Sequence, residues 1–225
     1  MKKILVLILL FVSIMANAQQ EVTKFLGIPV DGYKPAMIEK LKAKGYEYNQ
    51  RLDCLTGEFN GYNVRLSIVT NNNKVWRIVV QDAITTDETN IKIRFNKLCR
   101  QFGKNKKYIP SAFEDQTLSD NEDISYEMMV NKKRYEAVFY QIPSTMDTLR
   151  IQQEIRNRLL EKYTEEQLEN PTEEIVSDSK YKTAIYMYKL CSKRTVWFLI
   201  DEHYGEYSII MYYDNEYNHS DGEDL

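Results

Sequence analysis

Residues 60–80 read NGYNVRLSIVTNNNKVWRIVV and predict an antiparallel pair of strands. The first strand alternates apolar and polar residues, which is typical of a strand with one buried and one wet face; its apolar members are Val64, Leu66 and Ile68. Asn60-Gly61 is a strong two-residue hairpin signal before this strand, and Asn71-Asn72-Asn73 predicts a second hairpin turn into Val75 to Val80. The centre of the first half is therefore an antiparallel meander.

Amphipathic helices are predicted on both sides of this meander. Pro35 suits the first position of a helix that Gly45 ends; the buried face of this helix is Met37, Ile38 and Leu41. After the meander, Thr85 and Glu88 are spaced as a capping box. The helix that they open ends at Gly103 and carries the clearest apolar stripe in the chain: Ile91, Phe95, Leu98, Cys99 and Phe102.

The second half predicts further strands and one long helix. The helix runs from about Thr145 to Tyr163, and an acidic segment, Thr164 to Ser179, follows it. Strand patterns occur at Ile124–Val130, Lys133–Ile142, Tyr181–Leu190, Thr195–Asp201 and Glu206–Tyr213. The predicted fold class is therefore α+β: antiparallel β-sheets, built from hairpins and meanders, with about three main α-helices packed against them.

The chain divides into a leader, two structured units and a tail. Residues 1–18 are the leader, 19–103 form an N-terminal α+β unit, and 124–213 form a C-terminal α+β unit packed with it in one compact domain. The polar stretch 104–123 is the candidate boundary, and the acidic tail 214–225 is expected to be solvated and disordered. An echo between Lys74–Ile78 and Thr195–Leu199 also suggests distant duplication, although the predicted element orders do not superimpose cleanly.

The leader has the pattern of a secretory signal peptide. Lys2 and Lys3 precede an apolar run from Ile4 to Met15, and Ala16-Asn17-Ala18 is an A-x-A cleavage site. The apolar run is too short to act as a stable membrane anchor. We therefore expect a mature chain that begins at Gln19 and resides in the periplasm or outside the cell, without a membrane anchor.

Charge and cysteine content narrow the choice of partners. The net charge is −3, and loss of the two leader lysines takes it to −5, which argues against a nucleic-acid partner. Three cysteines cannot all pair within one chain. A bridge between Cys54 and Cys99 is one option, but Cys99 lies on an apolar helix stripe, which favours a buried free thiol.

No cluster of residues predicts a catalytic, metal or cofactor site. Asp201-Glu202-His203 is explained by a polar hairpin turn, and with it only two converging metal ligands can be placed where zinc needs three or four. Cys191 lies beside the basic residues Lys193 and Arg194 but has no identified base, so a cysteine next to a basic turn is the favoured interpretation. We expect no cofactor and no metal.

The tyrosines suggest a binding surface. The chain has 17 of them, concentrated late in the sequence. If Tyr181–Leu190 and Glu206–Tyr213 are strands, both faces of their sheet are apolar or aromatic. One face would pack under helices, and the other would meet the N-terminal layer, a partner subunit or a ligand. The candidate binding residues are Tyr186, Tyr188, Tyr207, Tyr212 and Tyr213.

The N-terminal segment carries a resemblance. KFLGIPVDG at residues 24–32, followed by MIEKLKAKG at residues 37–45, resembles the mature N-terminus of small uncharacterised proteins that Gram-negative bacteria secrete, over about residues 24–102. That group has no established activity, so the resemblance implies only compartment and compactness. More loosely, a short helix feeding hairpins is similar to the modules of β-lactamase-inhibitor-like proteins and of small outer-membrane assembly factors. The chain lacks the lipid-bearing cysteine of the assembly factors.

Two hypotheses about function follow. The leading one is a non-enzymatic secreted or periplasmic module that binds a protein or glycan ligand through its tyrosine-rich C-terminal sheet. The alternative is a hydrolase that acts on cell-wall or glycan material through carboxylates that converge only in the fold. A deep pocket with two acids of separated pKa values would favour the hydrolase. The oligomeric state is left open by the sequence.

Overall fold

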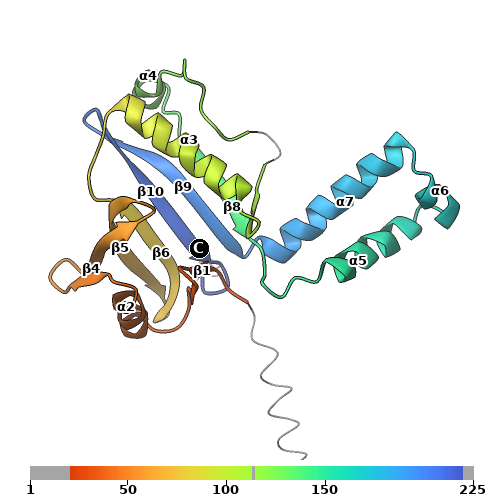
Figure 1. Cartoon of the computed structure of the whole chain (residues 1–225), viewed down its shortest axis with the longest axis horizontal. Coiled ribbons are helices and arrows are strands. Elements are labelled where there is room, and N and C mark those ends of the chain that lie inside the picture. Colours follow the sequence, from red (N-terminus) through yellow and green to blue (C-terminus); the bar gives the residue numbers. More distant parts are fainter. Residues whose placement is uncertain (1–20, 113–114, 220–225) are drawn as a thin grey trace, which may run out of the picture.

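The protein is built on one eight-stranded antiparallel sheet. The computed structural model describes residues 21–112 and 115–219, so the predicted signal peptide lies outside the described residues (Figure 1). The sheet has the order β3-β4-β5-β6-β10-β9-β8-β7. Its strands are β3 Glu47–Asn49, β4 Cys54–Phe59, β5 Tyr62–Asn71, β6 Lys74–Asp82, β7 Tyr108–Pro110, β8 Glu136–Gln141, β9 Arg194–His203 and β10 Glu206–Asn215; a separate hairpin joins β1 Lys24–Phe25 to β2 Ile28–Pro29. The α+β antiparallel class is confirmed.

The meander of the first half forms as predicted. Asn60 and Gly61 have φ values of 55° and 80°, and Asn72 and Asn73 have φ values of 47° and 64°. Two consecutive residues with positive φ make the two-residue turn whose twist matches that of antiparallel strands, and Asn and Gly adopt this conformation at low cost. Between the turns, residues of β5 alternate between buried and exposed over 63–68.

The two halves of the chain meet in the middle of the sheet, where β6 pairs with β10. Five residue pairs from Ile210↔Gln81 to Asp214↔Arg77 form this junction. In each half a helix precedes four strands, because α2 comes before β3–β6 and α3 before β7–β10. The sequence echo paired a segment of β6 with a segment of β9. In chain order, however, β6 is the last strand of the first half and β10 is the last strand of the second half, so β10 is the counterpart of β6. One core cluster contains residues from both halves, so the stretch 104–123 does not divide the core.

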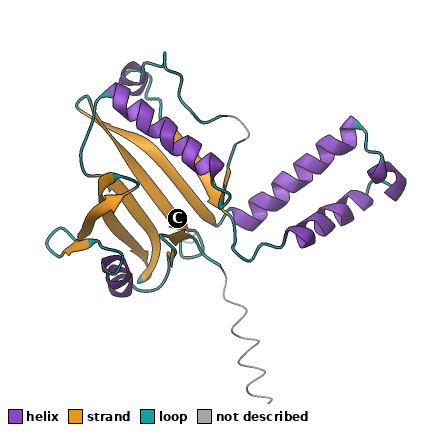
Figure 2. Cartoon of the chain, viewed as in Figure 1, coloured by secondary structure: helices purple, strands orange, loops and turns teal. Residues whose placement is uncertain are grey.

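Two helices cover the inner face of the sheet. They are α2, Lys34–Lys42, with Pro35 in its first turn, and α3, Glu88–Lys104, which lies across β9 and β10 (Figure 2). The predicted stripe of α3 is buried along its whole length. The predicted capping box is wrong, because Asp87 caps the helix by accepting a bond from the Asn90 N–H at 2.9 Å, while Thr85 bonds to Glu206. The helix also continues one residue past Gly103.

A buried ion pair ties α3 to the central strands. The Arg94 guanidinium donates two hydrogen bonds to the Asp82 carboxylate, one of them 2.6 Å long. The same carboxylate accepts the Ile209 backbone N–H of β10 at 3.1 Å, and the guanidinium stacks 3.3 Å from the centre of the Tyr62 ring. Asp82 therefore links α3, β6 and β10 at a single buried point.

Two predicted strands of the second half are helical. Ile124–Val130 is largely α4, Ile124–Met129, which Asp123 caps by accepting the Tyr126 N–H at 2.9 Å. Tyr181–Leu190 belongs to α7, Glu173–Cys191, whose cap is Thr172. Short apolar runs misled both predictions, since such a run cannot be told from part of a helix by its period alone.

The beginning of the predicted tail is part of the fold. Asp214 and Asn215 end β10 and are buried, and the Asn215 side chain donates to the Val30 carbonyl at 2.8 Å. Beyond the strand, Asn218 donates to the Asp31 carboxylate at 2.7 Å. The expectation of disorder is thus wrong for residues 214–219, because side chains of this segment complete the packing of the N-terminal hairpin. Residues 220–225 lie outside the described residues.

A helical arm is inserted between β8 and β9. It contains α5, Thr148–Leu160, α6, Glu165–Glu169, and α7, and it projects from the edge of the sheet (Figure 1). The predicted helix over 145–163 is confirmed as the shorter α5. The predicted acidic segment 164–179 forms α6 and the first turns of α7.

The N-terminal segment clamps the base of this arm. The Glu21 carboxylate accepts the Ser144 N–H at 3.0 Å, the Thr145 hydroxyl at 3.2 Å and the Lys24 ammonium at 2.8 Å. Burial by itself would raise the pKa of Glu21, but these donors outweigh burial and hold the pKa at about 2. Glu21 is therefore a fixed anion at neutral pH.

We predict that loss of Asp82 is strongly destabilising. Asp82→Ala leaves the Arg94 guanidinium buried without its partner, which costs about 3–5 kcal/mol of unfolding free energy. Urea denaturation measures this cost. Lys42→Ala is the control, because its pair with Glu39 is exposed and should cost less than about 1 kcal/mol. Equal costs for the two variants would contradict the role of the buried pair.

We also predict a pH-dependent contribution from Glu21. Its pKa in the folded state lies below the ordinary value of 4.5, so its stabilisation is complete above that pH and declines as the pH falls towards about 2. The difference in melting temperature between the wild type and Glu21→Gln should therefore be largest near neutral pH and shrink in acid. Differential scanning calorimetry from neutral pH to about pH 2 tests this prediction. A difference in melting temperature that stays constant with pH would refute the stabilising role of the Glu21 contacts.

Candidate functional site

The structure separates the five candidate tyrosines into three environments. Tyr207 and Tyr213 point into the core and are only 2% and 4% exposed. Tyr212 lies on the opposite face of β10 and is half-buried. Tyr186 and Tyr188 lie on α7 rather than on a strand, so the predicted tyrosine-rich sheet surface does not form as one patch. Burial also raises the pKa of Tyr212 and Tyr213, which keeps both phenols neutral at physiological pH.

Tyr212 belongs to an aromatic cluster around Arg77 on the outer face of the sheet. Its ring stacks on Trp197 with centroids 4.1 Å apart. The Arg77 guanidinium lies 4.7 Å from the Tyr212 ring and 4.1 Å from the Trp76 ring. Arg77 donates two bonds to Asp214, at 2.6 and 2.7 Å, and the Trp197 indole donates to the same carboxylate at 2.8 Å. These bonds satisfy the polar groups of Arg77, Asp214 and Trp197. The cluster therefore serves mainly to hold β10 against its two neighbouring strands, β6 and β9.

The sequence analysis did not identify Trp76 and Trp197, the other aromatic members of this cluster, as candidate site residues. The sequence contained a signal, because Trp76 and Trp197 are the residues of the internal echo. The cluster depends on cross-strand register, which places Tyr212 opposite both Val79 and Trp197 and places Asp214 opposite Arg77. Register across non-adjacent segments cannot be obtained from a local pattern.

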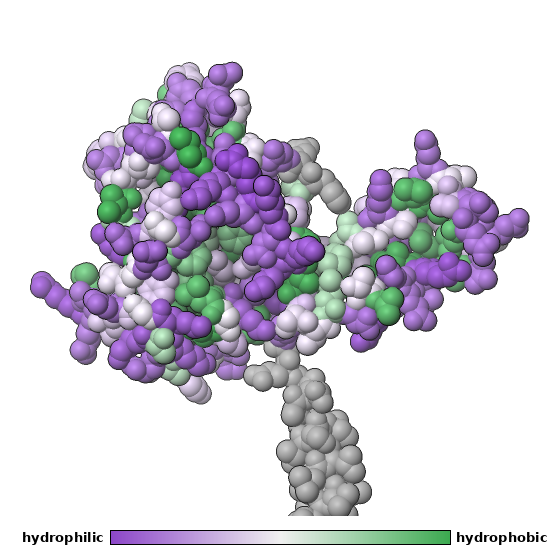
Figure 3. Space-filling view, viewed as in Figure 1, coloured by the Kyte–Doolittle hydropathy of each residue, from purple (hydrophilic) through white to green (hydrophobic). Residues whose placement is uncertain are grey.

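The arm exposes several large apolar side chains. Of the 19 residues of α7, only Ile175 and Cys191 are buried. Exposed apolar residues on the arm are Leu149, Val176, Tyr181 and Tyr188, and hydrophobic surface is visible along it in Figure 3. The last two turns of α7, from Ala184 to Cys191, are almost entirely apolar or aromatic, and such a stretch is normally enclosed by protein. This surface is therefore a candidate contact site.

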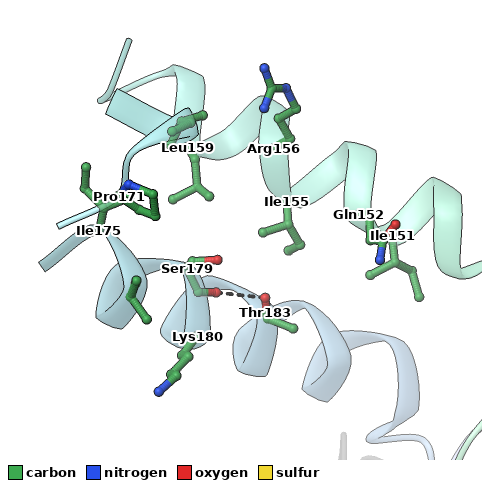
Figure 4. Close-up of a pocket in the computed structure, with 12 residues that line it drawn as sticks. Ile151, Gln152, Ile155, Arg156, Leu159, Pro171, Ile175, Ser179, Lys180 and Thr183 are labelled. Carbon is green, nitrogen blue, oxygen red and sulfur yellow. Dashed lines mark hydrogen bonds between the residues drawn. The ribbon is translucent and has the colours of Figure 1, made fainter. Parts of the chain in front are cut away.

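The two long helices of the arm enclose only a small core. Ile155 and Leu159 of α5 face Ile175 of α7 across a cavity of about 420 Å³ (Figure 4). The Thr183 hydroxyl bonds to the Ser179 carbonyl of its own helix at 2.8 Å, so it does not bridge the helices. With four buried side chains in α5 and α7 combined, packing between these helices contributes little to holding the arm rigid.

A groove separates α7 from the β7–β8 edge of the sheet. Its volume is about 700 Å³, and its aromatic lining comprises Tyr140 of β8 with Tyr181 and Tyr188 of α7. The Tyr140 and Tyr188 rings meet edge to face with centroids 5.7 Å apart. Among the described residues, Lys180 is the single charged residue of the lining. The groove can therefore accept an apolar segment and attract a negative charge beside it.

Cys191 and the two histidines, which were considered for catalysis and metal binding, lie in three separate environments. Cys191 is fully buried, and burial raises the pKa of its thiol, with Arg194 opposing in part. His203 lies at the exposed end of β9, and His219 packs against Trp76. Within residues 21–112 and 115–219 no group of three or more His, Cys, Asp or Glu residues has the geometry of a metal site.

The cysteines are free thiols. Cys54, Cys99 and Cys191 are all buried in the structure, and none forms a disulfide. The disulfide between Cys54 and Cys99 that was considered as one option is therefore absent, and both residues are buried free thiols, as the favoured interpretation predicted for Cys99. Cys99 lies within 3.6 Å of the Gln116 carbonyl, in the second half of the chain, and burial raises the pKa of its thiol to about 12.

Comparisons with protein-family models, curated proteins and solved structures returned no match to this chain. Among the described residues, no helix is both long and apolar enough to cross a bilayer. The case for a function therefore depends on the geometry of this chain.

We predict opposite outcomes for two tyrosine substitutions. Tyr188→Ser removes a side chain that is 55% exposed and loses its edge-to-face contact with Tyr140, which should together cost about 1 kcal/mol of unfolding free energy. Tyr213→Ser empties a core position and should cost about 3–5 kcal/mol. Urea denaturation of both variants tests the assignment. A loss of several kcal/mol for Tyr188→Ser would show that α7 has no free surface there.

Proposed function

We propose that the protein is a non-enzymatic binding module that holds an extended segment of a partner protein in the groove between α7 and the β7–β8 edge. The observation that carries this proposal is α7 itself, which keeps apolar and aromatic side chains exposed beside a tyrosine-lined groove. Tyrosine offers rigid contact area with a polar tip and is enriched at protein interfaces. Two of the five candidate tyrosines, Tyr186 and Tyr188, lie on this helix.

The shape of the groove favours an extended segment as its occupant. β7 is the last strand in the sheet order, so its outer edge has no partner strand among the described residues. The Tyr108 N–H of this edge already bonds to the Asn105 carbonyl at 2.9 Å, and Pro110 has no N–H. An extended occupant would therefore be held mainly by its side chains in the groove and not by a full ladder of backbone hydrogen bonds. Ile109 and Pro110 of β7 line the groove directly. Because Lys180 is the charged residue there, the best ligand combines apolar side chains with a flanking carboxylate.

The hydrolase alternative has one feature in its favour, because burial and the neighbouring Asp214 raise the pKa of Glu216, but neither residue lines the groove or the other two pockets. A carboxylate pair would need one acid with a raised pKa inside a pocket. Within the part of the chain that the structure describes, neither the lining of the groove nor that of the cavity between α5 and α7 contains a carboxylate. A larger pocket near the N-terminus contains Glu21 alone, whose pKa is lowered to about 2. The geometry of these sites supports binding better than acid–base chemistry.

The proposed location is the periplasm or the cell exterior. The leader pattern Lys2 to Ala18 supports it, as does the resemblance of residues 24–102 to secreted proteins of Gram-negative bacteria. The partner would then be a protein of the same compartment.

Site-specific photocrosslinking tests the proposal. A benzoylphenylalanine placed at Tyr181, which is 65% exposed, should crosslink one defined partner in periplasmic or secreted fractions. The same probe at Lys40 of α2 should not. The double variant Tyr181→Ser/Tyr188→Ser should lose the partner, whereas Tyr126→Ser, with a similarly exposed tyrosine on α4, should keep it. Equal capture by the two variants would refute the groove as the binding site.

A further inference from the structure

A second pocket lies beside the N-terminal hairpin, away from the groove. It has a volume of about 770 Å³, within the range of small-molecule sites. Its walls come from the β1–β2 turn, the end of α3, the start of β7 and the end of β8. It shares no lining residue with the groove beside α7. The pocket and the groove are therefore separate sites.

Four aromatic rings belong to the lining of this pocket, together with Leu26, Ile142 and Pro143. Phe59 and Tyr108 are half-buried and present their rings to the pocket, whereas Phe102 and Tyr213, which are 8% and 4% exposed, form its floor. Phe102 and Tyr108 meet edge to face with centroids 4.8 Å apart. Burial raises the pKa of Tyr108 and Tyr213, so both phenols stay neutral and do not repel an anion. Such a lining favours a planar aromatic ligand, which can stack or pack edge to face with these rings.

Hydrogen bonds hold the walls in place without a ligand. The Gln141 carboxamide accepts the Lys24 backbone N–H at 2.7 Å and donates to the Lys24 carbonyl at 3.0 Å and to the Tyr108 hydroxyl at 3.2 Å. On another side, the Asn60 side chain donates to Gln101 at 2.8 Å. A preformed site loses less free energy to ordering when a ligand binds.

The rim of the pocket is positively charged. Three lysines line it, and one of them, Lys24, is neutralised by Glu21, the single carboxylate of the lining. Lys106 and Lys107 are exposed and form no ion pair with any described residue. Two unpaired ammonium groups above an aromatic lining leave an excess of positive charge at the mouth.

We propose that this pocket binds a small organic anion with an aromatic body. The rings would hold the planar part, and Lys106 and Lys107 would pair with the carboxylate, sulfonate or phosphate. This is a ligand site in addition to the groove, and it would give a secreted binding module a second, small-molecule specificity. Because this pocket requires a negative charge on its ligand, it differs from a surface that binds through apolar contact alone, such as the arm.

Fluorescence titration with two naphthalene probes tests the proposal on the full mature chain. The probes are 8-anilinonaphthalene-1-sulfonate, which is an anion, and N-phenyl-1-naphthylamine, which is neutral and similar in shape. The anion should bind at one site per chain. The double variant Lys106→Glu/Lys107→Glu should weaken the anion by about tenfold or more while leaving the neutral probe nearly unchanged. Gln101→Trp, which fills the pocket from its rim, should weaken both probes.

A matched charge reversal is the control. Lys40→Glu/Lys44→Glu changes two exposed lysines of the α2 region and should leave the affinity of both probes intact. Circular dichroism confirms that each variant is folded. The proposal is overturned if the anion does not bind, if the two charge reversals act equally, or if Gln101→Trp has no effect. In the last case the probe is bound elsewhere, for which the arm is the obvious surface.

Discussion

The pairing of β6 with β10 is the constraint on which the rest of the fold depends. It joins strands separated by more than 120 residues and makes one sheet from two meanders. An aspartate fixes each end of the junction. Asp82 binds Arg94 of α3 and the Ile209 N–H, and Asp214 binds Arg77 and the Trp197 indole. Both carboxylates are buried, so their partners are required to compensate for desolvation, and the register of the two strands is fixed by charge as well as by packing.

At the β7–β8 edge, away from this central pairing, the sheet carries a long inserted element. The connection between β8 and β9 carries the whole helical arm, although these strands are antiparallel neighbours that a short turn could join. The inserted helices bury few side chains against each other and rely on the Glu21 clamp and the Tyr140–Tyr188 contact at their base. An element that contributes so little to the core is better explained by contacts with another molecule.

The same edge separates the two proposed binding sites. Tyr108 of β7 and Gln141 of β8 line the aromatic pocket, whereas their neighbours Ile109 and Tyr140 line the groove beside α7. Successive residues of a strand point to opposite faces, so a short strand pair can serve two surfaces. The pocket is lined by aromatic rings under a basic rim, and the groove is lined by tyrosine and aliphatic side chains. The two sites therefore suit different ligands, an aromatic anion and an apolar protein segment.

Local patterns in the sequence determined the fold class, the first meander with its Asn-rich turns, and the buried stripe of α3, because each depends on the conformational preferences of adjacent residues. The tertiary structure decided what depends on distant partners. Tyr181–Leu190 satisfies a strand period, yet it continues a helix that starts at Thr172, and its apolar residues face a groove instead of a neighbouring strand. Asp214 belongs to an acidic, tail-like segment, yet Arg77 and Trp197 bury it. The binding pockets could not be predicted from the sequence either, since Phe59, Lys107 and Tyr213 come together only when β6 has paired with β10.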